Sequence, residues 1–99
     1  MEVEKTAEFA EWVTRLADAR ARLRVVQRVE RLSLGNTGDS RSVGGGVMEL
    51  RIDYGPGYRV YFTRVGRTVV MLLCGGTKRG QQGDIDRAIE MARQLKNVR

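Results

Sequence analysis

The sequence predicts an α+β fold, in which two N-terminal helices pack on a three- to four-stranded antiparallel sheet and a C-terminal helix follows. Three observations lead to this prediction. Apolar residues recur at helical spacing in two segments before residue 35 and again after residue 84. Between residues 48 and 74 they alternate with polar residues and then form a continuous run, which is typical of strands. No repeat or linker interrupts the 99 residues, so we expect one domain over residues 1–99.

The first helix is expected to begin after Thr6, whose hydroxyl can accept a hydrogen bond from a free backbone N–H of the first turn. Its apolar positions follow the i, i+3, i+4, i+7 spacing of one helix face. These positions are Phe9, Trp12, Val13 and Leu16.

A second helix is expected from Asp18, as its cap, to about Leu34. Its predicted buried face consists of Ala19, Leu23, Val26, Val29 and Leu32. The outer face carries a stripe of arginines, formed by Arg20, Arg24 and Arg31 with Arg28 beside them. Arginine binds phosphate through its planar fork, whereas like charges at i, i+4 destabilise a helix. The stripe is therefore either a contact for nucleic acid or a solvated helix face.

The sheet is predicted from three strands and two tight turns. Gly55-Pro56-Gly57 turns the chain after the first of these strands, and Gly66-Arg67 fits a two-residue hairpin. If Tyr54 faces Tyr58, then Asp53 faces Arg59, Arg51 faces Tyr61 and Glu49 faces Thr63. All apolar residues of the first two strands then share one side. In the third strand, Val70, Leu72 and Cys74 are expected on the other side, which therefore needs an apolar cover.

Ser42 and Val43 are expected to add a short strand before Gly44-Gly45-Gly46, which reads as a hairpin turn. The glycine run lacks the lysine and the following helix of a phosphate-binding P-loop. The last helix is expected to follow Asp84. Its apolar stripe consists of Ile85, Ala88, Ile89, Ala92 and Leu95.

The composition points to an anionic partner. Eighteen lysines and arginines against twelve acidic residues give a net charge of +6 and a sequence pI of about 10.2. Such a surface attracts nucleic acid by counterion release, or an acidic protein. The sequence contains no histidine, and Cys74 is the only cysteine, so no metal site or cofactor is predicted and no internal disulfide can form. Without an apolar span or a signal peptide, we expect a cytoplasmic protein that does not enter membranes.

Taken together, the segments GNTGDSRSVGGGVMELRIDYGPGYRVYF and VVMLLCGGTKRGQQGDIDRAIEMA resemble the RelE/ParE superfamily of toxins, and most closely its HigB-like addiction-module killer branch. The resemblance spans nearly the whole chain. It implies the toxin of a type II toxin–antitoxin module, neutralised by a cognate antitoxin. Many members cleave mRNA on the ribosome without a metal, by attack of the 2′-hydroxyl on the adjacent phosphate.

The resemblance also implies roles for individual residues. Arg59 matches the arginine that contacts the scissile phosphate, and Lys78 and Arg79 match the basic pair after the last strand. Glu49 matches a position where other members carry lysine or a glutamate proposed as general base. The C-terminal catalytic tyrosine of some members has no counterpart, because Ile85 lies about where it would be. The predicted RNA or ribosome contacts are Arg51, Tyr61, Arg20, Arg24, Arg28 and Arg31.

Two other functions remain open at this point. A ParE-like inhibitor would act on DNA gyrase without cleaving RNA. A non-catalytic nucleic-acid-binding module would use the arginine stripe of the second helix. We also predict a basic groove formed by Arg51, Arg59, Lys78 and Arg79.

Overall fold

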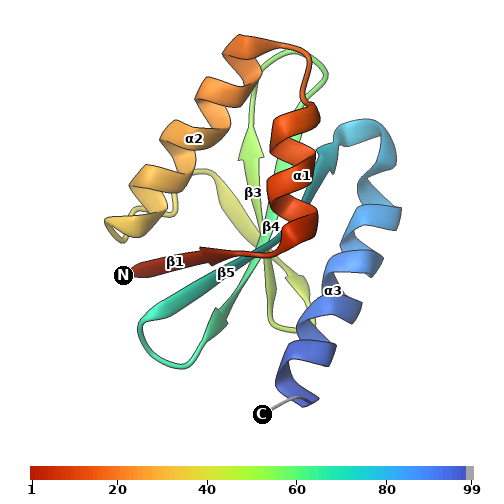
Figure 1. Ribbon diagram of the computed structural model, residues 1–99. Helices are drawn as coiled ribbons and strands as arrows, with labels where there is room; N and C mark the ends of the chain where they lie inside the picture. Colours follow the sequence, from red (N-terminus) through yellow and green to blue (C-terminus); the bar gives the residue numbers. More distant parts are fainter. Residues whose placement is uncertain (98–99) are drawn as a thin grey trace.

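The computed structural model describes residues 1–97 and confirms the α+β class. Two N-terminal helices, a mostly antiparallel sheet and a C-terminal helix follow one another in a RelE-like arrangement (Figure 1). The elements in chain order are β1 (Glu2–Lys5), α1 (Ala7–Arg15), α2 (Ala19–Ser33), β2 (Ser40–Gly44), β3 (Val47–Ile52), β4 (Tyr58–Val65), β5 (Val69–Thr77), the 3-10 turn η1 (Lys78–Gly80) and α3 (Gln81–Asn97). None of the described helices is long and apolar enough to cross a membrane.

The sheet has five strands in the order β1-β5-β4-β3-β2. The strands from β2 to β5 form the predicted antiparallel meander, including the short strand before the glycine turn. The edge strand β1 was not predicted, and it pairs parallel with β5. Its sequence, EVEK, has one apolar residue among three charged ones, so no alternation reveals it. Tertiary pairing with β5 creates this strand.

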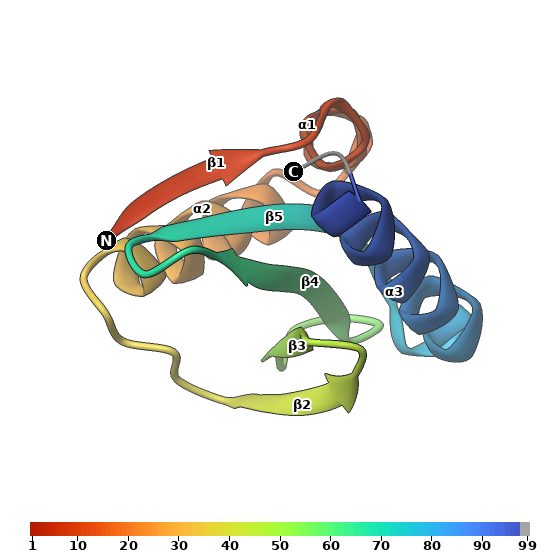
Figure 2. The same cartoon turned by 90° about the horizontal axis from the view of Figure 1, so that it is seen from below.

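The helices cover both faces of the sheet (Figure 2). Helices α1 and α2 pack on one face, around Leu50, Val60 and Phe62. Helix α3 packs on the other face, where its Ile85, Ala88 and Ala92 meet a second, smaller cluster. That cluster consists of Val47, Tyr61, Leu73 and Cys74. The predicted apolar cover is therefore α3 of the same chain.

The predicted face of Val70 and Leu72 was wrong. Both lie on the α1 and α2 side, whereas Cys74 shares the α3 side with Tyr61 as predicted. The pairing of β4 with β5 shifts between Tyr61, which faces Cys74, and Phe62, which faces Leu72. Leu73, which lies between these two partners on β5, has no paired residue on β4. Such a bulge reverses the alternation of side chains along the strand.

The predicted register of β3 and β4 was wrong by two residues. Arg51 faces Arg59 and Glu49 faces Tyr61, so the expected ion pair between Asp53 and Arg59 does not form. The assignment of faces survives because a shift of two residues preserves the alternation. The connection from Asp53 to Gly57 is longer than predicted, since Tyr54 leaves the ladder and donates a hydrogen bond to Asp18 Oδ2 at 2.9 Å. The β4–β5 turn is likewise longer, with three residues between the paired Val65 and Val69.

Helices α1 and α2 begin at the predicted caps. The Thr6 hydroxyl accepts a hydrogen bond from Phe9 N, and Asp18 accepts one from Arg20 N. The buried face of α2 differs from the prediction. It consists of Ala21, Val25 and Leu32. Leu23 and Val26 are instead exposed, at 57% and 44%.

Candidate functional site

An open cleft of ≈ 440 Å³ lies where β3 ends, β4 begins and the chain enters η1. We call it the basic cleft, because three cationic side chains line it. Its lining residues are Asp39, Arg51, Asp53, Gly55, Pro56, Gly57, Arg59 and Lys78. The structure thus brings together three of the four residues of the predicted basic groove. They come from two neighbouring strands and from the segment after β5.

Arg51 and Arg59 lie directly opposite each other on β3 and β4. Like charges in this position repel, so each needs a compensating anion. Arg51 Nη2 lies 2.7 Å from Asp39 Oδ1, and this ion pair raises the pKa of Arg51. Arg59 Nε lies 3.9 Å from Glu49 Oε1. Each guanidinium group in the wall of the cleft therefore has a carboxylate within ion-pair distance.

Glu49 is buried rather than on a solvated strand face. Its side chain is 0% exposed, and both carboxylate oxygens have partners. Oε1 accepts from Arg41 Nε at 3.0 Å, while Oε2 accepts from Tyr61 Oη at 3.1 Å and from Gln81 Nε2 at 2.8 Å. Burial alone raises the pKa of Glu49, but these donors outweigh it and leave the pKa below its ordinary value. Glu49 is thus a buried carboxylate that keeps its charge.

Arg59 is the most enclosed of the three cations, with 12% of its side chain exposed. Its Nε is buried and donates no hydrogen bond, while Nη1 donates to Tyr58 O at 3.2 Å. Gly57 lies beside this end of the guanidinium: a Cβ on Gly57 would come within 3.3 Å of Arg59 Nη1 and 3.5 Å of Lys78 Cβ. Gly57 has a φ of +81°, which favours glycine. Because it has no Cβ, it leaves space for the side chains of Arg59 and Lys78, which line the same cleft.

Arg79 does not join the cleft. It lies in η1 next to Lys78 and is exposed, but it is absent from the cleft wall. Tyr61 shares the strand face of Arg59, yet its side chain is fully buried between the sheet and α3. Burial and the charge of Glu49 raise the pKa of its hydroxyl, which remains protonated and donates to Glu49. In this conformation the Tyr61 ring is closed off from a base.

The arginine stripe of α2 is divided. Arg28 turns towards the sheet and donates to the carbonyl oxygen of Arg51 at 2.6 Å. Arg24 lies over the ring of Tyr54, 4.6 Å from its centroid. Arg20 and Arg31 are exposed. Sequence periodicity placed Arg28 outside because it counts apolar residues and does not register the carbonyl groups that accept hydrogen bonds from a half-buried guanidinium.

Sequence reasoning missed three residues of this site. Arg41 and Gln81 both donate to Glu49, and Asp39 pairs with Arg51. Each comes from a different element, β2, α3 and the loop before β2. Only Arg41 carried a signal, since the predicted strand around Ser42 had to run beside the segment that contains Glu49.

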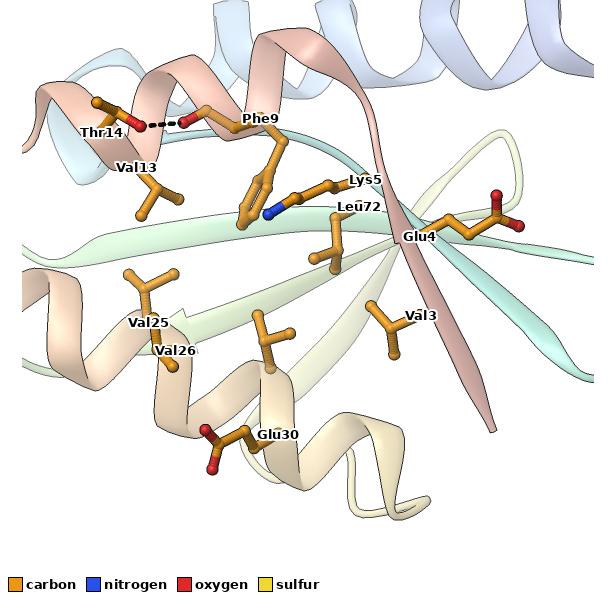
Figure 3. Close-up of a pocket in the computed structure, with 12 residues that line it drawn as sticks. Val3, Glu4, Lys5, Phe9, Val13, Thr14, Val25, Val26, Glu30 and Leu72 are labelled. Atoms are coloured by element: carbon orange, nitrogen blue, oxygen red, sulfur yellow. Dashed lines mark hydrogen bonds between the residues drawn. The ribbon is translucent and has the colours of Figure 1, made fainter.

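A second cavity, of ≈ 400 Å³, lies between α1, α2 and β1 (Figure 3). We call it the apolar groove, because Val3, Phe9, Val13, Val25 and Leu72 point into it. Lys5 is the single cation in its lining. It has no converging positive charges, so it does not compete with the basic cleft as a site for phosphate. Over residues 1–97, no group of three or more Cys, Asp or Glu side chains could hold a metal ion.

Comparison with known proteins places this chain beside a family and a relative. The family model described as "Phage derived protein Gp49-like (DUF891)" matches residues 11–97, from α1 to the last described residue of α3. An uncharacterized protein of Haemophilus influenzae is 42% identical over 95 residues, which cover 96% of this chain and 96% of that protein. Both matches include every residue of the basic cleft.

Proposed function

Because the chain belongs to the Gp49-like family, a HigB-like family of the RelE toxin superfamily, we propose that it is the toxin of a type II toxin–antitoxin module. We propose further that it is a metal-independent endoribonuclease which cleaves mRNA on the ribosome and so inhibits translation. One observation carries the proposal. Arg51, Arg59 and Lys78, far apart in sequence, converge on one cleft. Such a cluster of cations suits a phosphodiester in RNA.

The proposed reaction needs charge stabilisation above all. The 2′-oxygen bonds to the adjacent phosphorus and loses its proton, while the P–O5′ bond breaks and the 5′-oxygen gains a proton. The products are a 2′,3′-cyclic phosphate and a 5′-hydroxyl end. Extra negative charge develops on the phosphoryl oxygens in the transition state. Arg59 and Lys78 are the groups we assign to that charge, because preorganised donors of this kind often supply the largest catalytic effect.

The arginines other than Arg59 are assigned to binding rather than to chemistry. Arg51 faces Arg59 and is held by Asp39, so it extends the positive wall along which a backbone would run. Arg20, Arg24 and Arg31 on α2, and Arg79 on η1, would add contacts to ribosomal or messenger RNA. An antitoxin is the implied protein partner, and an acidic segment in the basic cleft would neutralise both binding and catalysis.

The test is expression of the chain in growing cells, with and without its neighbouring open reading frame. Primer extension should then map new mRNA ends at codon positions, and growth should recover when the antitoxin is present. Arg59→Ala and Lys78→Ala should remove these ends, while Arg64→Ala should not. Arg64 is the matched control because it is an exposed arginine of the same strand, outside the basic cleft.

Three outcomes would contradict the proposal. Intact transcripts together with trapped gyrase–DNA complexes would favour the ParE-like activity. Full toxicity of Arg59→Ala would remove the phosphate clamp, and nucleic-acid binding without toxicity would favour a non-catalytic module.

A further inference from the structure

Arg59 has one carboxylate within ion-pair distance in the described chain, and that carboxylate is buried. Glu49 Oε1 lies 3.9 Å from Arg59 Nε, while Arg41 Nε already donates to the same oxygen at 3.0 Å. The carboxylate therefore lies between two arginines. One of them is half exposed, at 51%, and the other lines the basic cleft.

The surroundings of Glu49 leave it no direct access to a substrate proton. Its side chain is 0% exposed, it does not line the basic cleft, and its two oxygens accept from Arg41, Tyr61 and Gln81. A general base must reach the proton it removes, directly or through one water. Glu49 can instead act through its charge. When one member of a buried ion pair is removed, the remaining charge is left without compensation, and its buried position becomes strongly unfavourable.

We infer that Glu49 is a positioning residue: its fixed negative charge holds the Arg59 guanidinium in the cleft wall, with Nε towards Glu49 and the Nη end beside Gly57. This inference rests on the proposed function, since it assigns Glu49 to the phosphate clamp instead of to proton abstraction. Arg41 and Arg59 share Oε1, so Arg41 limits how closely Arg59 approaches Glu49. Gln81 and Tyr61 keep the carboxylate in place from the α3 side.

The first test measures hydrogen exchange of the arginine Nε–H groups by NMR in ¹⁵N-labelled full-length protein. Glu49→Gln should speed exchange at Arg59 roughly tenfold or more, because the buried guanidinium then loses the carboxylate that lies within ion-pair distance of its Nε. Arg41→Gln should slow exchange at Arg59, because Oε1 then becomes free to accept from Arg59 Nε. General loosening of the fold would speed exchange in both variants, so the opposite signs identify positioning.

The control is Glu90→Gln, which removes an exposed carboxylate from α3 where it pairs with Arg93. It should leave exchange at Arg59 unchanged. Should Glu49→Gln fail to fold, Arg41→Gln still decides the matter, since Arg41 is half exposed on an edge strand. Unchanged or faster exchange at Arg59 in Arg41→Gln would overturn the inference.

The second test separates positioning from base catalysis. It uses ribosomes carrying an mRNA with one 2′-deoxy nucleotide at the mapped cleavage position, which binds but cannot react. Glu49→Gln should weaken binding by the same factor as Arg59→Ala, and the double variant should be no weaker. Unchanged binding with lost cleavage would identify a base and overturn the inference. If the wild-type chain cleaves no mRNA, the proposed function fails, while the exchange measurement still supports or overturns the positioning of Arg59 by Glu49.

Discussion

Arg51 and Arg59 lie opposite each other across β3 and β4, with their side chains on the same face and in the same cleft. Two positive charges in directly opposed positions cost stability. Asp39 offsets the charge of Arg51, and Glu49 that of Arg59. Lys78 and Asp53 also line the cleft, so three carboxylates accompany its three cations. A phosphate bound in the cleft would add an anionic partner for Arg51, Arg59 and Lys78.

The first prediction concerns phosphate binding in the basic cleft. Inorganic phosphate should raise the melting temperature more than chloride at the same ionic strength, because a ligand that binds only the folded state stabilises it. Arg59→Ala should lose most of this gain, and Arg64→Ala should keep it. Differential scanning fluorimetry measures both. An equal gain in all three proteins would show that phosphate acts through the solvent and not in the basic cleft.

The second prediction uses two glycines with the same backbone conformation. Gly57 has φ of +81° and Gly66 has φ of +70°, so alanine at either position should cost about 1–2 kcal/mol of unfolding free energy. A Cβ at Gly57 meets Arg59 and Lys78, whereas one at Gly66 meets nothing within 4 Å. Urea unfolding should therefore show similar losses, while cleavage and toxicity fall only in Gly57→Ala. Equal loss of activity in Gly66→Ala would show that general destabilisation, not the shape of the cleft, is responsible.

The third prediction concerns acid stability. The pKa of Glu49 lies below its ordinary value of 4.5, so its stabilising effect is fully present above that pH and is lost as pH falls through the folded-state pKa. Glu49→Gln should thus be less stable than wild type at pH 7, and the difference should shrink below pH 4. Urea unfolding at several pH values measures this. A difference that stays constant down to pH 3 would mean that the charge of Glu49 contributes nothing.

The fourth prediction concerns the single cysteine. Burial, followed by the charge of Glu8, raises the pKa of Cys74 to about 12, and its side chain is 3% exposed. At pH 8 only about one thiol in ten thousand is then ionised, and the thiolate is the reactive form. Iodoacetamide should modify the native protein far more slowly than the protein in urea, as mass spectrometry would show. Rapid modification of the folded protein would place Cys74 at the surface.

The sequence alone determined the fold class, the helix caps at Thr6 and Asp18, and the assignment of Arg51 and Arg59 to one face of the sheet. These features depend on local chemistry and on side-chain alternation, both of which survive a shift of register by two residues. The roles that the family resemblance implied for Arg59 and Lys78 stay predictions until they are tested.

Only the tertiary structure decided which side chains contact each other. Tyr54 leaves the ladder and donates to Asp18, and Arg51 lies opposite Arg59. The bulge in β5 between Leu72 and Cys74 turns Val70 and Leu72 to the other face. Arg28 turns towards the sheet and donates to a backbone carbonyl. The environment of Glu49 depends on donors from β2, β4 and α3, which no local pattern connects. A strand pattern specifies the direction in which a side chain points, whereas its charge partners are chosen by the packing of distant segments.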